Sequence, residues 1–373
     1  MKILLLTTHL NTGGISTYTV NLARYLKGAG IEVTVASSGG NLTANLEKED
    51  IPHVVLDIRT KSEFGIKVWK ALPKLKRLVG DGNYDIIHAQ TRVAQVLASL
   101  VKRSMGVPFI STCHGFFKSQ RISRRLFPCW GDKVIAISKS VSAHLIEDLH
   151  VPKERVKMIY NGIELDRYQV PGASMEKNVL KENIGLGEDA FTVGTVGRLS
   201  PVKGHAYLID AFKEAIRKQP GMQLLIVGEG PDEEMLKEKV RKAEITDKVF
   251  FAPGNDVPLE EYFSIMDIFC LASTSEGLGF SLMEAMAAGR PCIASNVGGL
   301  AELIIHTEDG LLVPSRDVSA LGDAIHKLFS DGSLRQQLSD KARKKALSSF
   351  SIKDSVKKTV EVYKEIVDVR DKR

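Results

Sequence analysis

Two glutamates separated by seven residues flank a glycine-rich turn that leads into a helix-forming run. Glu276 and Glu284 enclose a segment that begins Gly277, Leu278, Gly279, Phe280 and Ser281. The first amides of a helix lack intrahelical partners and the helix dipole favours negative charge there, so this turn predicts a phosphate site. A carboxylate beside a phosphate is tolerated when it accepts hydrogen bonds from ligand hydroxyls, such as those of a sugar diol. The alternative is an acidic helix cap with a solvated glutamate behind it.

Basic residues and glycines after two other expected strands could serve the same ligand. Arg198 and Lys203 follow one strand, where the guanidinium can form a fork on phosphate oxygens and the ammonium adds a mobile charge. A solvated surface loop is the alternative. Gly13 and Gly14 follow the first strand, where glycine lets the backbone approach a ligand closely. No G-x-G-x-x-G fingerprint occurs, so a Rossmann-type dehydrogenase is disfavoured.

Several catalytic motifs are missing from the sequence. It has no Asp-x-Asp pair to hold Mg²⁺ against a diphosphate, which predicts no metal site. It also lacks G-x-x-x-x-G-K-[ST], G-x-S-x-G and H-E-x-x-H, which disfavours P-loop NTPases, serine hydrolases and zinc peptidases. Neutralisation of a bound phosphate is therefore expected from Arg198, Lys203 and helix amides.

The candidate residues lie in loops between short apolar segments. Strands are expected at 2–7, 31–36, 85–88, 108–112 and 133–137, and again at 191–196, 223–227, 249–252, 268–271 and 291–294. Helical segments separate them, which predicts two α/β domains, each with a parallel sheet covered on both faces. The stretch 171–190 lacks periodicity and carries turn residues, so a domain boundary is expected near it.

Length and composition agree with two globular domains. The 373 residues exceed one ordinary core of about 100–200 residues, and 43% hydrophobic residues exclude a wholly disordered chain. A net charge of +6 is a mild bias that does not identify a nucleic-acid binder. Four dispersed cysteines form no disulfide or zinc pattern. No apolar run reaches membrane-spanning length and the N-terminal one is too short for a signal peptide, so we expect a cytoplasmic protein.

In combination, these motifs resemble those of one family. The pair Glu276-x7-Glu284, Arg198 with Lys203-Gly204, the Gly13-Gly14 pair and the Tyr-Asn-Gly-Ile segment 160–163 look like the GT4-type retaining glycosyltransferases (glycosyltransferase group 1) of the GT-B fold. Their order and spacing cover nearly the whole chain, from position 13 to about 289.

The resemblance implies two Rossmann-like, doubly wound parallel-sheet domains that face across a cleft. An N-terminal acceptor-side domain is expected over 1–170 and a C-terminal nucleotide-sugar-binding domain over 171–350. A final helix over 351–373 is expected to pack back on the N-terminal domain. Apolar residues at helical spacing favour such a packed face: Val356, Val360, Tyr363 and Ile366.

The resemblance also implies roles for the C-terminal residues. Glu284 would accept the ribose hydroxyls and Glu276 a hydroxyl of the donor sugar. Amides of 277–281 would hold the sugar and the distal phosphate, and the main chain near Glu229 would contact the base. Arg198 and Lys203 would stabilise the leaving diphosphate as charge develops on it.

Two N-terminal sites complete the implied catalytic arrangement. Gly14, next to Gly13, would approach the diphosphate from the other domain. His114 matches the family histidine near the donor sugar, whose backbone or side chain assists at the anomeric centre; a hydrogen-bonded loop histidine is the alternative. The implied chemistry is retaining, metal-independent hexosyl transfer without a cofactor, by front-side attack. UDP is the commonest donor base in the family and is expected on that ground alone.

A basic stretch after His114 bears on the acceptor. Arg121, Arg124 and Arg125 lie within about one helical turn, with apolar neighbours. This pattern is typical of a patch for anionic lipid or of a site for a phosphorylated saccharide, and the alternative is a solvated helical face. We expect a saccharide or lipid-linked acceptor in cell-envelope glycan synthesis (lipopolysaccharide or polysaccharide), with peripheral association at the inner face of the plasma membrane.

Two other functions remain open at this point. A sugar-nucleotide epimerase would share the two-domain architecture but matches the motifs less well. A non-catalytic sugar-nucleotide-binding protein would not need Gly13-Gly14 and His114 in addition to the donor residues. The donor sugar, the base, the linkage and the oligomeric state cannot be read from the sequence.

Overall fold

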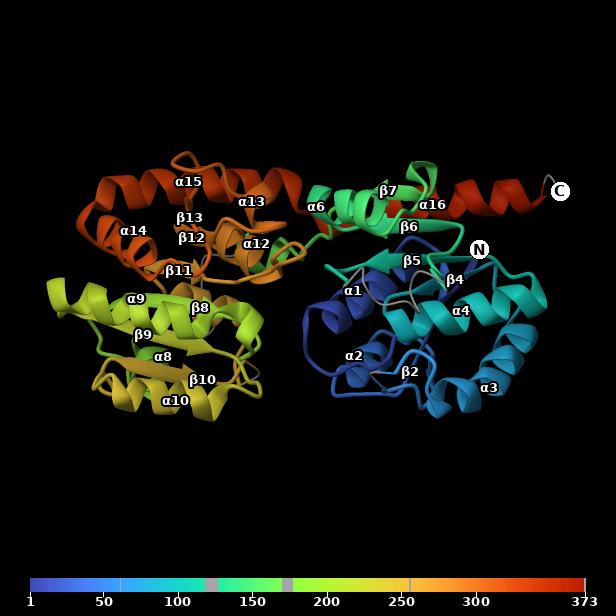
Figure 1. Cartoon of the computed structure of the whole chain (residues 1–373), viewed down its shortest axis with the longest axis horizontal. Coiled ribbons are helices and arrows are strands. Elements are labelled where there is room, and N and C mark those ends of the chain that lie inside the picture. The colour runs from blue at the N-terminus through green and yellow to red at the C-terminus, as the bar shows by residue number, and fades with distance from the viewer. Residues whose placement is uncertain (61, 118–126, 170–176, 255, 372–373) are drawn as a thin grey trace. The chain divides into compact units, whose positions relative to one another are not determined.

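The chain folds into two compact units, each built on one sheet (Figure 1). The computed structural model describes residues 1–60, 62–117, 127–169, 177–254 and 256–371. Unit 1 comprises Met1–Gly162 and the residues from Ile352 onward, and unit 2 comprises Ile163–Ser351. The units divide at 162/163, and the Ile163 amide donates to the Phe350 carbonyl within unit 2 at 2.8 Å.

Unit 1 contains a seven-stranded sheet in the order β3-β2-β1-β4-β5-β6-β7, in which all pairs are parallel. The strands are β1 (Lys2–Leu6), β2 (Glu32–Ser37), β3 (His53–Val55), β4 (Ile86–Ala89), β5 (Phe109–Cys113), β6 (Lys133–Ala136) and β7 (Val156–Met158). In the central register Leu4 lies opposite Thr34 and Ile87. Residues Ile3 to Leu6 are fully buried, as expected for a strand covered on both faces.

Helices cover the faces of this sheet. They are α1 (Gly14–Gly28), α2 (Thr43–Lys48), α3 (Ile66–Gly82), α4 (Arg92–Met105), α6 (Lys139–Ala143), the π-helical η1 (His144–Asp148), the 3₁₀ turn η2 (Lys153–Arg155) and α16 (Ile352–Asp371). The final helix α16 packs against α1, and a buried hydrogen bond of 2.7 Å joins the Tyr363 hydroxyl to His88 Nδ1 on β4. Val356, Tyr363 and Ile366 are buried, so the predicted apolar stripe is the packed face of α16.

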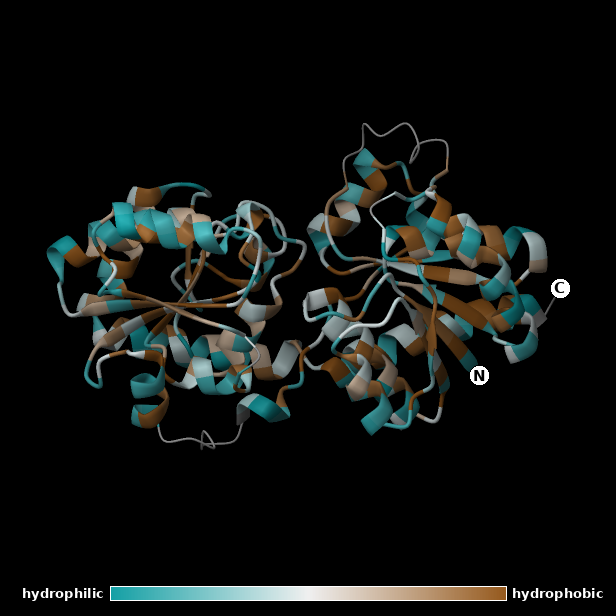
Figure 2. Cartoon of the chain, turned by 90° about the horizontal axis from the view of Figure 1, so that it is seen from below, coloured by the Kyte–Doolittle hydropathy of each residue, from teal (hydrophilic) through white to brown (hydrophobic). Residues whose placement is uncertain are grey.

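Unit 2 contains a six-stranded parallel sheet in the order β10-β9-β8-β11-β12-β13. Its strands are β8 (Phe191–Val196), β9 (Met222–Val227), β10 (Val249–Ala252), β11 (Ile268–Leu271), β12 (Cys292–Ser295) and β13 (Leu311–Val313). Its helices are α7 (Asp166–Gln169), α8 (Lys177–Ile184), the 3₁₀ turn η3 (Pro201–Lys203), α9 (His205–Lys218), α10 (Glu233–Lys242), α11 (Leu259–Ser264), α12 (Phe280–Ala287), α13 (Leu300–Leu303), α14 (Val318–Ser330) and α15 (Gly332–Ser349). The apolar strands and polar outer helix faces are evident in Figure 2.

Two parallel sheets of this order confirm the predicted α/β class and its doubly wound domains. The stretch 171–190, near which a domain boundary was expected, contains a helix that the sequence did not reveal, α8 (Lys177–Ile184). Leu180 is the one buried residue of this short helix, so no apolar period was present to reveal it. The sequence also did not reveal β3, β7 and β13, because three residues are too few for a strand pattern. Within the described residues, no helix is long and apolar enough to cross a membrane.

Candidate functional site

The charged residues predicted in unit 2 converge at one edge of its sheet. The order of the sheet reverses direction between β8 and β11, which is the point where parallel sheets bind ligands beyond the carboxyl ends of their strands. Arg198 and Lys203 follow β8, and Glu276 follows β11. The topology therefore brings these three side chains to the two strands that flank the switch point.

The loops after β8 and β9 pack main chain against main chain through glycines. Gly228 has a φ of +138°, and a Cβ on it would lie 2.1 Å from the Gly197 carbonyl oxygen. A Cβ on Gly230 would lie 2.1 Å from the Leu199 carbonyl oxygen. The Leu199 amide donates to the Glu229 carbonyl at 2.9 Å, while the Glu229 side chain is exposed. These contacts fix the path of the basic loop.

The turn before α12 is also built on close glycine contacts. Gly279 caps the helix with a φ of +103°, and a Cβ there would lie 2.4 Å from Leu300 Cδ2. The Gly299 amide donates to the Glu276 carbonyl at 3.0 Å, which holds the other side of the turn. Because a glycine cap has no side chain, it cannot satisfy the first amides of α12. The sequence predicts an anion site at this helix start, where the helix dipole favours negative charge.

Lys203 and Glu276 form an ion pair within this site. Lys203 Nζ lies 2.5 Å from Glu276 Oε2, and the Ser273 hydroxyl donates to the same oxygen at 3.3 Å. Both charged side chains are largely buried, with 23% and 17% of their surface exposed. An ammonium carries three donors, so Lys203 can keep this bond and still contact a phosphate oxygen. Arg198, five positions earlier in the same loop, is exposed.

Glu284 lies in the second turn of α12 in a hydrogen-bonded environment. Burial raises its pKa to about 7, although the Arg167 charge and a hydrogen bond from the Tyr168 hydroxyl act in the opposite direction. Arg167 is itself paired with Glu260 at 2.6 Å. Tyr168 is thus a site residue that sequence reasoning missed, because its partner is distant in the chain and no local motif marks it.

In unit 1, the predicted glycines begin helix α1. Gly13 is the N-cap, with a φ of +154°, and nothing lies within 4 Å of the position of its Cβ. Gly14 is the first helical residue and is exposed. This turn follows β1, which borders the switch point of the unit 1 sheet next to β4. It presents uncapped helix amides without a charged side chain in the first turn.

His114 follows β5 and is held by neutral partners. Asn161 Nδ2 donates to His114 Nδ1 at 3.4 Å, so the proton on Nε2 is donated to Gln90 Oε1 at 2.9 Å. The Tyr18 ring packs edge-on at 5.5 Å. Burial lowers the pKa of His114 to about 3, so the imidazole is neutral at physiological pH. Because both ring nitrogens of His114 are hydrogen-bonded within unit 1, its main chain is more available to a substrate than its side chain.

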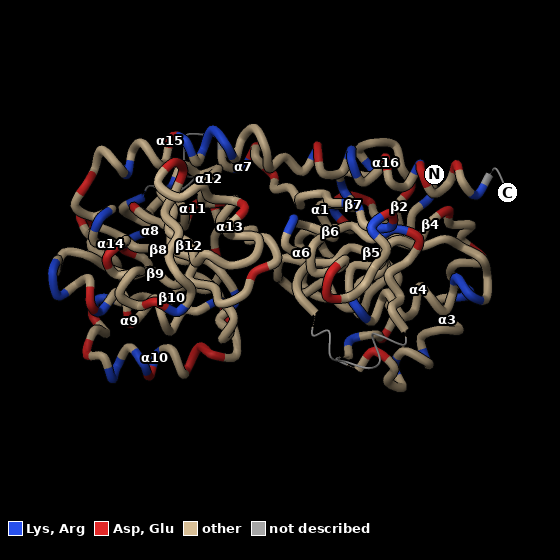
Figure 3. The backbone as a smooth tube through the Cα atoms, turned by 45° about the horizontal axis from the view of Figure 1, so that its top comes forward, with Lys and Arg blue, Asp and Glu red and all other residues tan. Residues whose placement is uncertain are grey.

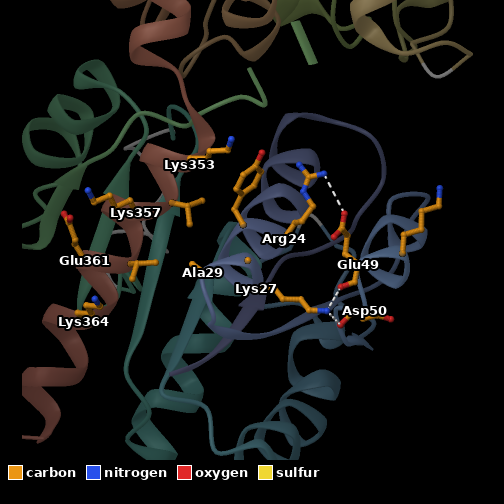
Figure 4. A pocket seen from close by; sticks show the side chains of 14 residues that line it. Arg24, Lys27, Ala29, Glu49, Asp50, Lys353, Lys357, Glu361 and Lys364 are labelled. Carbon is orange, nitrogen blue, oxygen red and sulfur yellow. Dashed lines mark hydrogen bonds and ion pairs between the residues drawn. The ribbon is translucent and has the colours of Figure 1, made fainter. Parts of the chain in front are cut away.

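The remaining predictions have different outcomes. Arg121, Arg124 and Arg125 lie outside the described residues. Across the described ranges, no group of three or more His, Cys, Asp or Glu side chains could hold a metal ion. None of the predicted site residues lines the large groove of unit 1, about 1060 Å³ in volume, that runs between the ends of α1 and α2 and the face of α16 (Figure 4).

Comparisons with known proteins identify the family of the chain. Residues 12–167 match the family model described as Glycosyltransferase Family 4, and residues 176–345 match Glycosyl transferases group 1. A UDP-Gal:alpha-D-GlcNAc-diphosphoundecaprenol alpha-1,3-galactosyltransferase of Escherichia coli is 30% identical over 318 residues, which cover 81% of either chain.

Solved structures show the same architecture. A glycosyltransferase from Rickettsia africae superposes with a TM-score of 0.85 at 25% identity, covering 98% of both chains. HepE of Anabaena, in complex with UDP and glucose, superposes with a TM-score of 0.86 at 24% identity over 98% of this chain and 100% of its own. The fold is therefore GT-B. The chain belongs to glycosyltransferase family 4 (glycosyltransferase group 1) and is a nucleotide-sugar glycosyltransferase.

Proposed function

We propose that this enzyme transfers a hexose, with retention of configuration, from a UDP-sugar to a saccharide or lipid-linked acceptor in cell-envelope glycan synthesis. The observation that carries the proposal is the pairing of Lys203 with Glu276 beside the uncapped start of α12, at the switch point of the unit 2 sheet. An Escherichia coli relative acts on a lipid diphosphate acceptor, and HepE binds UDP and glucose, which supports both substrate classes.

The donor is held by unit 2 in this proposal. The diphosphate lies against Arg198, Lys203 and the amides of 277–281, the ribose hydroxyls donate to Glu284, and a sugar hydroxyl donates to Glu276. The Lys203 ammonium and the Ser273 hydroxyl both donate to Oε2 of Glu276, so Oε1 can accept from the sugar. The main chain of the 228–230 turn, beside Glu229, receives the base. Fixed positive charge beside the leaving phosphate stabilises the transition state more than the ground state, because charge develops there as the bond breaks.

The transfer step needs no metal in this proposal. The acceptor hydroxyl forms its bond to the anomeric carbon on the face from which the diphosphate leaves, and its proton passes to the departing phosphate oxygen. Gly13 and Gly14 bring helix amides to the diphosphate, and the main chain of His114 contacts the donor sugar. A neutral His114 supports this assignment, because only the protonated imidazolium form would act as a general acid.

The acceptor side is assigned to the N-terminal domain, 1–170, the donor side to the C-terminal domain, 171–350, and 351–373 is the helix that returns. We propose that the enzyme works in the cytoplasm and associates peripherally with the inner face of the plasma membrane, where lipid-linked acceptors reside. Family membership favours this transferase over the epimerase and over a non-catalytic binding protein.

Two measurements test the proposal. In a thermal-shift screen of UDP-, GDP- and ADP-sugars, UDP-sugars should raise the melting temperature most, because a ligand that binds only the native state stabilises it. Release of UDP should then depend on an added acceptor such as GlcNAc-diphospholipid. Conversion of the donor to an epimer without acceptor, or stabilisation by none of the nucleotide sugars, would overturn it.

A further inference from the structure

Helix α3 exposes large apolar side chains on the face that points away from its own core. Val68, Leu75 and Val79 are buried against the sheet of unit 1. On the opposite face, however, Ile66 is 71% exposed and Trp69 is 53% exposed. Both lie in the first turn of the helix, three positions apart, and are therefore neighbours on its surface. An ordinary surface helix carries polar residues at such positions.

The same face of α3 carries two exposed basic residues. The helix carries five basic residues, Lys67, Lys70, Lys74, Lys76 and Arg77, against one acid, Asp81. Lys70 and Arg77 are exposed and lie four and eleven positions after Ile66, on the same side of the helix. Lys67 and Lys74 are drawn to the β3–α3 connection, where they bond to Asp57 and to the Val55 carbonyl, both at 2.7 Å. Figure 3 locates α3 among the charged residues of unit 1.

A further exposed apolar residue lies near the start of the helix. The Phe64 ring, two positions before α3, packs edge-on against Phe127 with their centroids 5.4 Å apart. Phe127 is itself 42% exposed. We define the α3 surface as Ile66, Trp69, Lys70, Arg77 and Phe127.

The large groove of unit 1 offers an instructive contrast. Its rim is also basic, with Arg24, Lys27, Lys48, Lys353, Lys357 and Lys364 (Figure 4). Three acids share that rim, however: Glu49, Asp50 and Glu361. Lys27 Nζ donates to the Glu49 and Asp50 carbonyls at 2.6 and 3.0 Å, and Arg24 lies 3.9 Å from the Glu49 carboxylate. The groove thus combines mixed charge with a floor of small apolar residues, and it exposes no tryptophan.

We propose that the α3 surface docks this enzyme on an anionic lipid bilayer. Trp69, Ile66 and Phe127 enter the headgroup region, where an amphipathic indole is most stable, and Lys70 and Arg77 lie against lipid phosphates. Charge complementarity selects this occupant, because the exposed apolar residues are flanked by the long cationic side chains of Lys70 and Arg77. The inference deepens the membrane association in the proposed function and rests on it.

Fluorescence of the native chain provides a direct test. The protein has two tryptophans, and Trp130 is buried, so Trp69 reports on its own surroundings. With vesicles of phosphatidylglycerol and phosphatidylcholine at low salt, we expect co-flotation and a blue shift of the emission. Pure phosphatidylcholine should bind at least about tenfold more weakly. Flotation with an unchanged Trp69 emission, or equal binding to neutral vesicles, would overturn the proposal.

Matched variants locate the surface. I66S/W69S and K70Q/R77Q should each weaken vesicle binding about tenfold or more, whereas K357Q/K364Q, which removes two exposed lysines from the groove, should change it less than about twofold. Stabilisation by a UDP-sugar should be equal in all of them, which shows that they are folded and bind the donor.

If the wild type floats and I66S/W69S floats equally well, the assignment of docking to the α3 surface is wrong and the membrane association stands. If the wild type does not float, both are wrong. A Trp69 shift that depends on protein concentration without vesicles would indicate a second copy as the occupant, and would also overturn the proposal.

Discussion

The two units share the same order of central strands, but the loops at the switch point carry charged side chains in one unit and uncharged groups in the other. In unit 2 the loops after the two strands at the switch point hold Arg198, Lys203 and Glu276. In unit 1 the corresponding loops hold the Gly13–Gly14 turn and Gln90. One site is charged and internally paired, while the other offers helix amides and neutral side chains.

This difference fits the proposed function, in which unit 2 supplies the positive charge for the donor diphosphate. A diphosphate needs fixed positive charge, and the Lys203–Glu276 pair provides an ammonium whose position is already set. His114 fits this pattern, because burial and hydrogen bonds to Gln90 and Asn161 keep it uncharged.

Removing the charged pair should have the largest effect. Lys203→Ala and Glu276→Ala should each lower kcat/KM on the order of 10²- to 10⁴-fold, because electrostatic stabilisation of the leaving diphosphate or the grip on the sugar is lost. Steady-state kinetics over a wide range of donor concentrations measures this. The matched control is Lys237→Ala, which breaks an exposed pair with Glu233 of 2.7 Å on α10 and should leave turnover unchanged. Full turnover by either site variant would remove that residue from the site.

The neutral site of unit 1 should respond to bulk rather than to charge. Gly14 has no positive φ and is exposed, so Gly14→Ala should leave the melting temperature unchanged or slightly raised, since alanine favours helix. A methyl group between the first amides of α1 and the diphosphate should nevertheless lower kcat/KM on the order of 10- to 100-fold. Unchanged kinetics in this variant would show that α1 does not approach the donor.

Tyr168 offers a smaller, pH-dependent test of unit 2. The Tyr168 hydroxyl and the Arg167 charge lower the pKa of Glu284, whereas burial and the Glu260 charge raise it. Tyr168→Phe should therefore move the pKa of Glu284 above about 7, so that more of it is protonated at neutral pH. Donor affinity should fall severalfold at pH 7 and recover toward pH 8.5. An affinity profile that coincides with that of a Tyr207→Phe control would contradict the role of Tyr168.

The smallest expected effect is on stability. Glu284 has a raised pKa in the folded protein, so its ionisation opposes folding above its ordinary pKa, and this penalty is complete once the pH exceeds about 7. Glu284→Gln should accordingly raise the melting temperature by a few degrees at pH 8 and by almost nothing near pH 4.5. Calorimetry at the two pH values measures the difference. An equal shift at both would show that Glu284 is not buried in its charged form.

Most of the fold could be predicted because each central strand is a continuous apolar run and each long helix has a buried stripe. The strands from Phe191 and Ile268 and the packed face of α16 are examples. The edge strands β3, β7 and β13 could not be predicted, because three residues are too few to show a period. Helix α8 could not be predicted for a related reason, because Leu180 is its one buried residue.

The candidate site divides in the same way. Glu276, Glu284 and Lys203 stand in local motifs whose chemistry can be recognised without a structure. Tyr168 and Gln90 could not be found, because their roles come from contacts with residues brought near by the sheet. The Lys203–Glu276 pair was likewise invisible as a pair, although both members were predicted separately.

A crystal structure with a bound, non-hydrolysed UDP-sugar tests the central claim most directly. The account predicts the diphosphate against Arg198, Lys203 and the first amides of α12, with the ribose hydroxyls on Glu284. A donor bound elsewhere, with the start of α12 empty of phosphate, would contradict it.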